Sequence, residues 1–154
     1  VAGTEIGVTE PEATFSACFG EPFMPMHPGV YADLLSEKMA EHGSTAWLIN
    51  TGWSGGSYGV GNRMKIKYTR AMLNAALDGE LDDVEYITDE RFGFEIPKSC
   101  PGVPSDVLIP RQTWENKDEY DTTADRLASM FNKNFQRYSS GVSDEVNAAA
   151  PIVN

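Results

Sequence analysis

The stretch from residue 50 to residue 70 holds the residue types best suited to binding a ligand. It contains five glycines within ten positions: Gly52, Gly55, Gly56, Gly59 and Gly61. Glycine permits positive φ and lets backbone N–H groups approach a ligand closely, and such a loop before a helix can bind an anion at the helix N-terminus. The loop lacks Gly-Lys-Ser/Thr and does not fit the dinucleotide spacing G-x-G-x-x-G. The alternative is a flexible surface loop that binds nothing.

A cluster of basic residues follows the glycines. Four of the chain's 12 lysines and arginines lie within eight positions: Arg63, Lys65, Lys67 and Arg70. In a chain of net charge −11, local positive charge beside a glycine loop favours a small anionic ligand such as a nucleotide. The alternative is that these cations are solvated and pair with nearby carboxylates. The hydroxyl of Thr69 can either cap the following helix or bind a ligand lying over it, and the sequence does not decide between these roles.

The loop and the basic cluster lie between an expected strand and an expected helix. The short apolar run 45–50 is of strand type, and the apolar spacing over 68–77 predicts a helix. Residues 63–67 alternate, so their three basic side chains would point to the same side of an extended segment.

The other expected elements complete an α/β arrangement. They are a strand at 14–19, a helix at 28–42, one or two short strands within 84–96, a surface excursion over 97–114, a helix beginning near residue 116, and a frayed tail over 139–154. Pro28 suits the first turn of its helix, and Asn116 and Glu119 have the spacing of a capping box. A helix followed closely by a buried strand indicates an α/β layer.

Composition narrows the classes of function. The 154 residues suffice for one domain with a core, and no apolar stretch is long enough to span a membrane. The net negative charge argues against nucleic acid and against an anionic membrane surface. Cys18 and Cys100 have no metal-binding spacing, and we expect free thiols with Cys18 buried. His27 and His42 lie at expected helix ends, where a structural role is favoured.

Six segments resemble the ATP-dependent phosphoenolpyruvate carboxykinase family. They are AGTEIGVTEPEATFSACFG (2–20), HPGVYADLLSEKM (27–39), LINTGWSGG (48–56), GNRMKIKYTRAM (61–72), FEIPKSCPGV (94–103) and LIPRQTW (108–114). They occur in the family's order, and the resemblance runs from about residue 2 to about residue 138. This agreement is far more specific than any single short motif.

The resemblance implies a fold and an activity. It implies the C-terminal part of a nucleotide-binding α/β domain, a mixed sheet with flanking helices that is incomplete in this chain. The implied enzyme is a cytoplasmic lyase of gluconeogenesis, a decarboxylase that converts oxaloacetate and ATP to phosphoenolpyruvate, ADP and CO2. It would use Mg2+ with the nucleotide and a second divalent metal, often Mn2+, at the reacting centre.

Family roles transfer only to matching positions. The resemblance implies nucleotide contacts by Arg63, Met64 and Thr69, and it makes residues 1–17 similar to the lid that closes over the family's active site. The phosphate-binding loop, the metal ligands and the arginines that hold oxaloacetate lie upstream in the family and have no match here. We therefore expect no catalytic or metal-binding residue in this chain, and we expect a missing N-terminal portion as its partner.

Two alternatives remain beside a portion of the enzyme. One is a noncatalytic nucleotide-binding module, and the other is a structural remnant without a ligand. The absence of an initiator Met and the lid-like start favour a portion of the enzyme. An incomplete domain should also expose an apolar face that its missing part would cover.

Overall fold

The computed structural model of this chain describes residue 7 and residues 14–18, 20–57 and 59–154. It divides into two compact units. The first comprises residues 1–45 and 132–149, and the second comprises residues 46–131 and 150–154. The lid-like segment 1–17 lies outside the described residues except for residues 7 and 14–17, so its proposed role stays a prediction.

Helix α1 (Pro28–His42) is the main element of the first unit, and its bounds are those expected from the sequence. His27 is the N-cap, because its Nδ1 accepts a hydrogen bond of 3.1 Å from the backbone N–H of Gly29. Gly43 ends the helix in the left-handed conformation at φ 62°, a geometry that favours glycine. The structural role expected for His27 is therefore confirmed.

The chain's C-terminal part packs against the start of α1 within this first unit. A side chain at Gly29 would collide with the backbone carbonyl of Gly141, and one at Gly141 would collide with the imidazole of His27. Two main-chain segments therefore meet at van der Waals distance, which only glycine allows. The ring of Tyr138 lies edge-on to His27 at 6.0 Å.

The expectation of a frayed tail is wrong. Residues 139–154 include the 3-10 helix η2 (Ser139–Gly141) and helix α6 (Asp144–Ala148), in addition to the contact just described. Ser143 caps α6 through a 3.3 Å hydrogen bond from the N–H of Val146, and two acidic residues follow it, as is typical of a helix start. The 3-10 helix η1 (Glu21–Phe23) is held to the same region by Glu21, which accepts hydrogen bonds from Arg137 and Tyr138.

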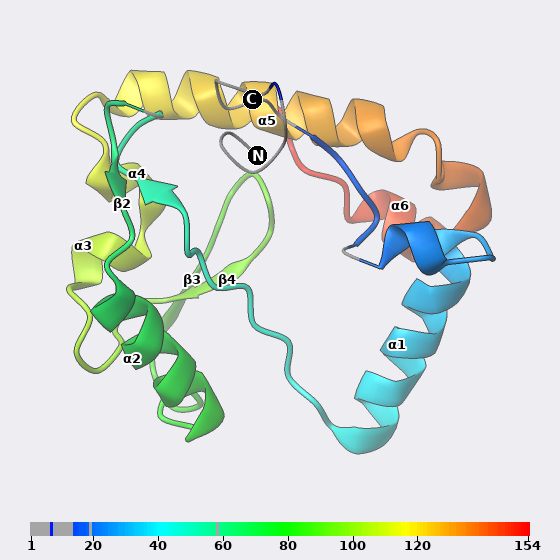
Figure 1. The fold of residues 1–154 in the computed structure, drawn as a ribbon, viewed down its shortest axis with the longest axis horizontal. Coiled ribbons are helices and arrows are strands. Elements are labelled where there is room, and N and C mark those ends of the chain that lie inside the picture. Colours follow the sequence, from blue (N-terminus) through cyan, green and yellow to red (C-terminus); the bar gives the residue numbers. More distant parts are fainter. Residues whose placement is uncertain (1–6, 8–13, 19, 58) are drawn as a thin grey trace. The chain divides into compact units, whose positions relative to one another are not determined.

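Helices and short antiparallel sheets make up the second unit (Figure 1). Its elements in chain order are β1 (Trp53–Ser54), β2 (Asn62–Arg63), α2 (Ile66–Leu77), β3 (Tyr86–Thr88), β4 (Glu95–Pro97), α3 (Ser105–Leu108), α4 (Pro110–Thr113) and α5 (Lys117–Phe135), of which α5 continues beyond residue 131 into the first unit. Strand β1 pairs with β2, and β3 pairs with β4. An α/β chain is thus confirmed, but the described residues form two separate hairpins rather than one mixed sheet.

The core of the second unit lies where α2 meets the segment that follows β4. Its buried members are Ala75, Leu81, Cys100 and Val103. Tyr68, Ala71 and Met72 of α2 pack against them, as does Trp47. The segment 97–114, expected as a surface excursion, instead supplies two core residues and helices α3 and α4.

Two expected strands do not form in the part of the chain that the structure describes. Residues 45–50 and the described part of 14–19 form neither helix nor strand. A strand needs a neighbour to pair its N–H and C=O groups, and the described residues offer none to either segment. Cys18 is exposed, contrary to expectation, whereas Cys100 is buried. Burial raises the pKa of the Cys100 thiol, so it is a packing residue rather than a nucleophile.

Asn116 caps the start of helix α5, which confirms its half of the predicted capping box. The side-chain Oδ1 of Asn116 accepts hydrogen bonds from the N–H groups of Asp118 and Glu119 at 3.0 and 3.3 Å. Ala124 and Ala128 are its buried residues. Small side chains at these positions let the helix approach the rest of the unit closely.

An ionic network fixes α5 to the β3–β4 turn and to α4. Arg91 bonds to Asp125 through Nε at 2.6 Å and pairs with Asp121 at 3.3 Å, while Arg111 binds Asp121 at 2.9 Å. The hydrogen bond from Arg111 lowers the pKa of Asp121, and that from Arg91 lowers the pKa of Asp125. Both carboxylates therefore stabilise the fold while they are charged.

Candidate functional site

A cavity of about 560 Å³ lies where the β1–β2 hairpin meets the start of α2. Its lining residues are Thr51, Arg63, Met64, Lys65, Ile66 and Thr69. They come from three adjacent pieces of chain: the turn before β1, the end of β2 and the first turn of α2. All three pieces belong to the second unit.

The hairpin fixes Arg63 and Met64 at the cavity. Arg63 is paired in register with Trp53, and the N–H of Met64 donates a 2.7 Å hydrogen bond to the carbonyl of Gly52. Met64 is 9% exposed, so its side chain is an apolar wall. A Cβ at Gly61 would lie 2.6 Å from the carbonyl oxygen of Ser54, so the hairpin can close only with glycine at this position.

The cavity has a positive lining. Arg63 and Lys65 border it, and the lining includes no carboxylate. Neither side chain forms an ion pair or a hydrogen bond within the described part of the chain. The ammonium of Lys65 lies over the ring of Tyr68, 5.7 Å from its centroid. The ammonium of Lys67 lies over the same ring at 4.9 Å. In so acidic a chain, unpaired cations around a hollow favour an anionic ligand.

Thr69 contributes a free hydroxyl. It lies in the fourth position of α2, which has Lys65 as its N-cap residue and no side-chain capping bond. The Thr69 hydroxyl makes no hydrogen bond to another described residue, and it lines the cavity. Of the two roles that the sequence left open, capping is therefore not seen, and the hydroxyl is available to a ligand.

The structure brings together the three residues predicted to contact a nucleotide, because Arg63, Met64 and Thr69 all line this cavity. Whether they bind one stays a prediction. The prediction that the three basic side chains of residues 63–67 point to the same side is wrong. Helix α2 starts at Ile66, so Lys67 lies in a helix and does not line the cavity.

The sequence interpretation missed Thr51, Lys65 and Ile66 as lining residues. Thr51 lies twelve positions before Arg63 and reaches the cavity only through the hairpin pairing. Lys65 and Ile66 were missed because no capping side chain marks the start of α2. The basic cluster itself was the signal that could have identified Lys65.

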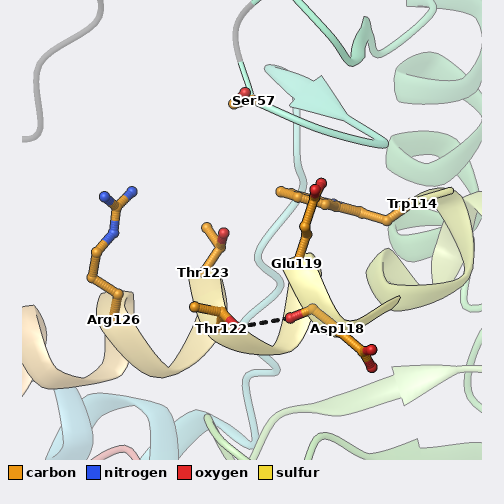
Figure 2. A pocket seen from close by; sticks show the side chains of 7 residues that line it. All are labelled: Ser57, Trp114, Asp118, Glu119, Thr122, Thr123 and Arg126. Atoms are coloured by element: carbon orange, nitrogen blue, oxygen red, sulfur yellow. Dashed lines mark hydrogen bonds between the residues drawn. The ribbon is translucent and has the colours of Figure 1, made fainter. Parts of the chain in front are cut away.

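A second cavity, of about 490 Å³, lies between the glycine loop and α5 (Figure 2). Its lining residues are Ser57, Trp114, Asp118, Glu119, Thr122, Thr123 and Arg126. Figure 2 shows the side chains of Arg126 and Thr123 rising from α5 toward the side on which Ser57 lies. The hydroxyl of Thr122 instead donates a 2.9 Å hydrogen bond to the carbonyl of Asp118. This lining mixes two carboxylates with one guanidinium, so it has no marked preference for an anion.

The described residues do not fit a metal centre. They contain no group of three or more His, Cys, Asp or Glu side chains that could hold a metal ion, and the first cavity is lined by cations, which repel one. In the same part of the chain, no helix is both long and apolar enough to cross a membrane.

Comparison with known proteins gives a consistent set of relatives. A model of the phosphoenolpyruvate carboxykinase family matches residues 1–106. The phosphoenolpyruvate carboxykinase (ATP) of Flavobacterium johnsoniae is 59% identical over 152 residues, which are 99% of this chain and 28% of the relative. The enzymes of the same name from Thermus thermophilus (58% identical; 98% of this chain, 28% of the relative) and Geobacter metallireducens (59%; 93% and 27%) are similar. The chain thus spans little more than a quarter of the length of these relatives.

Proposed function

Since the chain belongs to the ATP-dependent phosphoenolpyruvate carboxykinase family, we propose that it supplies the Arg63, Met64 and Thr69 contacts to ATP in such an enzyme. The complete enzyme would convert oxaloacetate and ATP to phosphoenolpyruvate, ADP and CO2 in gluconeogenesis, in the cytoplasm. The observation that carries the proposal is the shared cavity: the three residues lie together beside unpaired positive charge.

Each residue has a role that its chemistry supports. Arg63 would bind the nucleotide by charge-assisted hydrogen bonds or stack on its base, since a guanidinium can do both. Met64 would contact the nucleotide through its backbone or by apolar packing, and Thr69 would donate or accept a hydrogen bond through its hydroxyl. Together they hold and orient ATP, while the atoms that react lie elsewhere in the enzyme.

Divalent metals would be bound outside this chain. The family's Mg2+ and Mn2+ would neutralise charge on the transferred phosphoryl group and on the enolate, and the residues described here offer them no ligand set. The contribution of this chain to the chemistry is therefore binding and orientation of the nucleotide.

A noncatalytic nucleotide-binding module is the second candidate. It is favoured by one observation, that Arg63, Met64 and Thr69 lie together at one cavity formed by this chain's own residues. Such a module would bind ATP through the same three residues without any carboxykinase activity.

A chimeric enzyme tests the proposal. In the Flavobacterium johnsoniae enzyme, the 152 aligned residues would be replaced by this chain, and phosphoenolpyruvate formation from oxaloacetate and ATP would be measured. We expect activity in the chimera, and we expect Arg63→Ala to lower kcat/KM for ATP by about tenfold to a hundredfold, the worth of a hydrogen bond to a charged group. Arg63→Lys should lose less, because it keeps the charge but not the planar fork.

The outcomes separate the candidates. An active chimera that is indifferent to Arg63→Ala would reject the nucleotide site. An inactive but folded chimera that still binds ATP through Arg63 would favour the noncatalytic module. If the isolated chain also fails to bind ATP at any concentration tested, the module is excluded.

A further inference from the structure

Helix α2 has two apolar faces, and only one of them packs against other described residues of the second unit. Tyr68, Ala71, Met72, Ala75 and Ala76 form the inner face, which packs on the core. Ile66, Arg70, Leu73 and Leu77 form a second stripe along the outer face, with the i, i+4, i+7, i+11 spacing that places residues in line along a helix. We call this second stripe the outer stripe.

The outer stripe is open to solvent. Ile66 is 73% exposed, Leu73 is 46% exposed and Leu77 is 75% exposed. A surface helix normally carries polar residues on the face that points away from its core. Scattered exposed leucines need no explanation, but three large apolar side chains aligned on one face of a helix are the kind of feature that marks an interaction site.

Arg70 lies in the middle of the outer stripe and has no partner there. It forms no ion pair or hydrogen bond with the described residues, although the chain has 23 Asp and Glu residues. Arginine is enriched at protein interfaces, and the buried centre of an interface is more apolar than its rim. The surface that covers this stripe should therefore be apolar and should place a carboxylate or a backbone carbonyl opposite Arg70.

The occupant follows from the length of the relatives. The Flavobacterium and Thermus enzymes are each more than three times as long as the part that this chain matches, so most of a carboxykinase is available to cover surfaces of this segment. The outer stripe also starts at the candidate nucleotide cavity, because Ile66 belongs to both. A protein segment that binds to the outer stripe would therefore lie next to the candidate nucleotide cavity.

We propose that the outer stripe of α2 is the docking surface for the part of a carboxykinase that lies outside this chain. Ile66, Leu73 and Leu77 would supply the buried apolar contact, and Arg70 would pair with an acceptor on that part. The proposal depends on family membership and not on nucleotide binding, so the two can fail separately. A second copy of the chain is the competing occupant, and the test distinguishes it.

Thiol labelling measures whether the stripe is covered. Leu77→Cys would be made in the isolated chain and in the Flavobacterium chimera, and labelling at this position would be followed by peptide mass spectrometry. Glu90→Cys, at an exposed polar position, is the control. Leu73→Cys is the second stripe position, used if Leu77→Cys disturbs folding, and native Cys18, which is exposed, reports reagent activity in the isolated chain.

We expect Leu77→Cys to be labelled at least about tenfold more slowly in the chimera than in the isolated chain, because a covered thiol reacts only when the interface opens. Glu90→Cys should react within about twofold of the same rate in both, as an exposed residue does. Adding Arg70→Glu should restore labelling of the chimera by about tenfold, whereas Arg70→Lys should restore less.

Two results would overturn the proposal. Equal labelling of Leu77→Cys and Leu73→Cys in the isolated chain and the chimera would show that nothing covers the stripe. Protection in the isolated chain that disappears on dilution, with none added by the chimera, would assign the stripe to a second copy of the chain instead.

Discussion

The two cavities of the second unit are similar in size but differ in charge. The first, at the start of α2, is lined by Arg63 and Lys65 without any acid. The second, over α5, is lined by Asp118 and Glu119 as well as Arg126. Carboxylates in the lining of a cavity repel an anionic ligand and offset the attraction of a guanidinium there. Only the first cavity therefore leaves its positive charge fully available.

They also differ in how they are supported. Met64, in the wall of the first cavity, is nearly buried, and the hairpin that carries it is joined to α4 by a 3.2 Å hydrogen bond between the hydroxyls of Ser54 and Thr113. The side chains of the second cavity project from the surface of a single helix for the most part. A ligand gains more from a pre-formed site, because less conformational entropy is lost on binding.

Charge reversal should produce the largest difference between the cavities. In the chimera, Arg63→Glu should lower kcat/KM for ATP by more than about a hundredfold, since it replaces an attraction to the phosphates or base by a repulsion. The matched change in the second cavity, Arg126→Glu, should alter the same quantity by less than about threefold. Steady-state kinetics with ATP as the varied substrate measures both, and equal losses would show that the cavities do not differ as proposed.

Truncation of the apolar wall should come next. We expect Met64→Ala to lower the free energy of unfolding of the chain by about 2 kcal/mol, at the low end for a core methionine because the side chain borders a cavity. Thr122→Ala, on the surface of the second cavity, should stay within about 0.5 kcal/mol of the parent. Urea unfolding followed by tryptophan fluorescence provides the values. A Met64→Ala variant as stable as Thr122→Ala would mean that the first cavity has no rigid wall.

Removal of one hydroxyl should have a smaller effect on function. Thr69→Val keeps the shape of the side chain and removes its hydrogen bond, so kcat/KM for ATP in the chimera should fall by about twofold to tenfold. Thr123→Val, the matched change in the second cavity, should leave it unchanged within error. If Thr69→Ser does not retain the activity of the parent, the hydroxyl is not the group that matters.

Acid should lower the stability of the fold slightly and gradually, because it protonates the carboxylates of the ionic network on α5, the helix that lines most of the second cavity. Asp121 and Asp125 have a pKa below the ordinary 3.8 because of hydrogen bonds from Arg111 and Arg91 respectively. A lowered pKa in the folded state gives a stabilisation that is complete above the ordinary value and is lost as the pH falls through the lowered one. In the parent, the urea concentration at the unfolding midpoint should therefore decrease as the pH is lowered below about 4. It should decrease less steeply in Asp125→Asn and in Arg91→Met. If the urea midpoint depends on pH as steeply in both variants as in the parent, the ionic network does not cause this dependence.

The sequence was most informative where local chemistry decides the structure. Helix α1 was predicted from Pro28 to His42 because a proline, an apolar stripe and a glycine stop all agree, and the Asn116 cap of α5 was equally visible. Arg63, Met64 and Thr69 were named from the resemblance, and the structure gathers them at one cavity. Elements with complete local signals need little help from the rest of the fold.

It was least informative where pairing or packing decides. The run 45–50 has strand composition but forms no strand, since a strand also depends on a neighbour that periodicity cannot supply. Thr51 reaches the cavity only because β1 pairs with β2. The tail is ordered, and Ser143 with the two acids after it is a helix-start signal. Its contact with Gly29 follows from neither segment alone.

The meeting of the two glycines in the first unit has a consequence for biosynthesis. Glu21 and Arg137, which are bonded within that unit, are 116 positions apart in the sequence. A ribosome releases the N-terminal partner long before the C-terminal one, so the packing around the start of α1 cannot form until the segment with Arg137 and Gly141 has been synthesised. The second unit, most of which is contiguous in sequence, can fold earlier, and closing the long loop should then be the slow step.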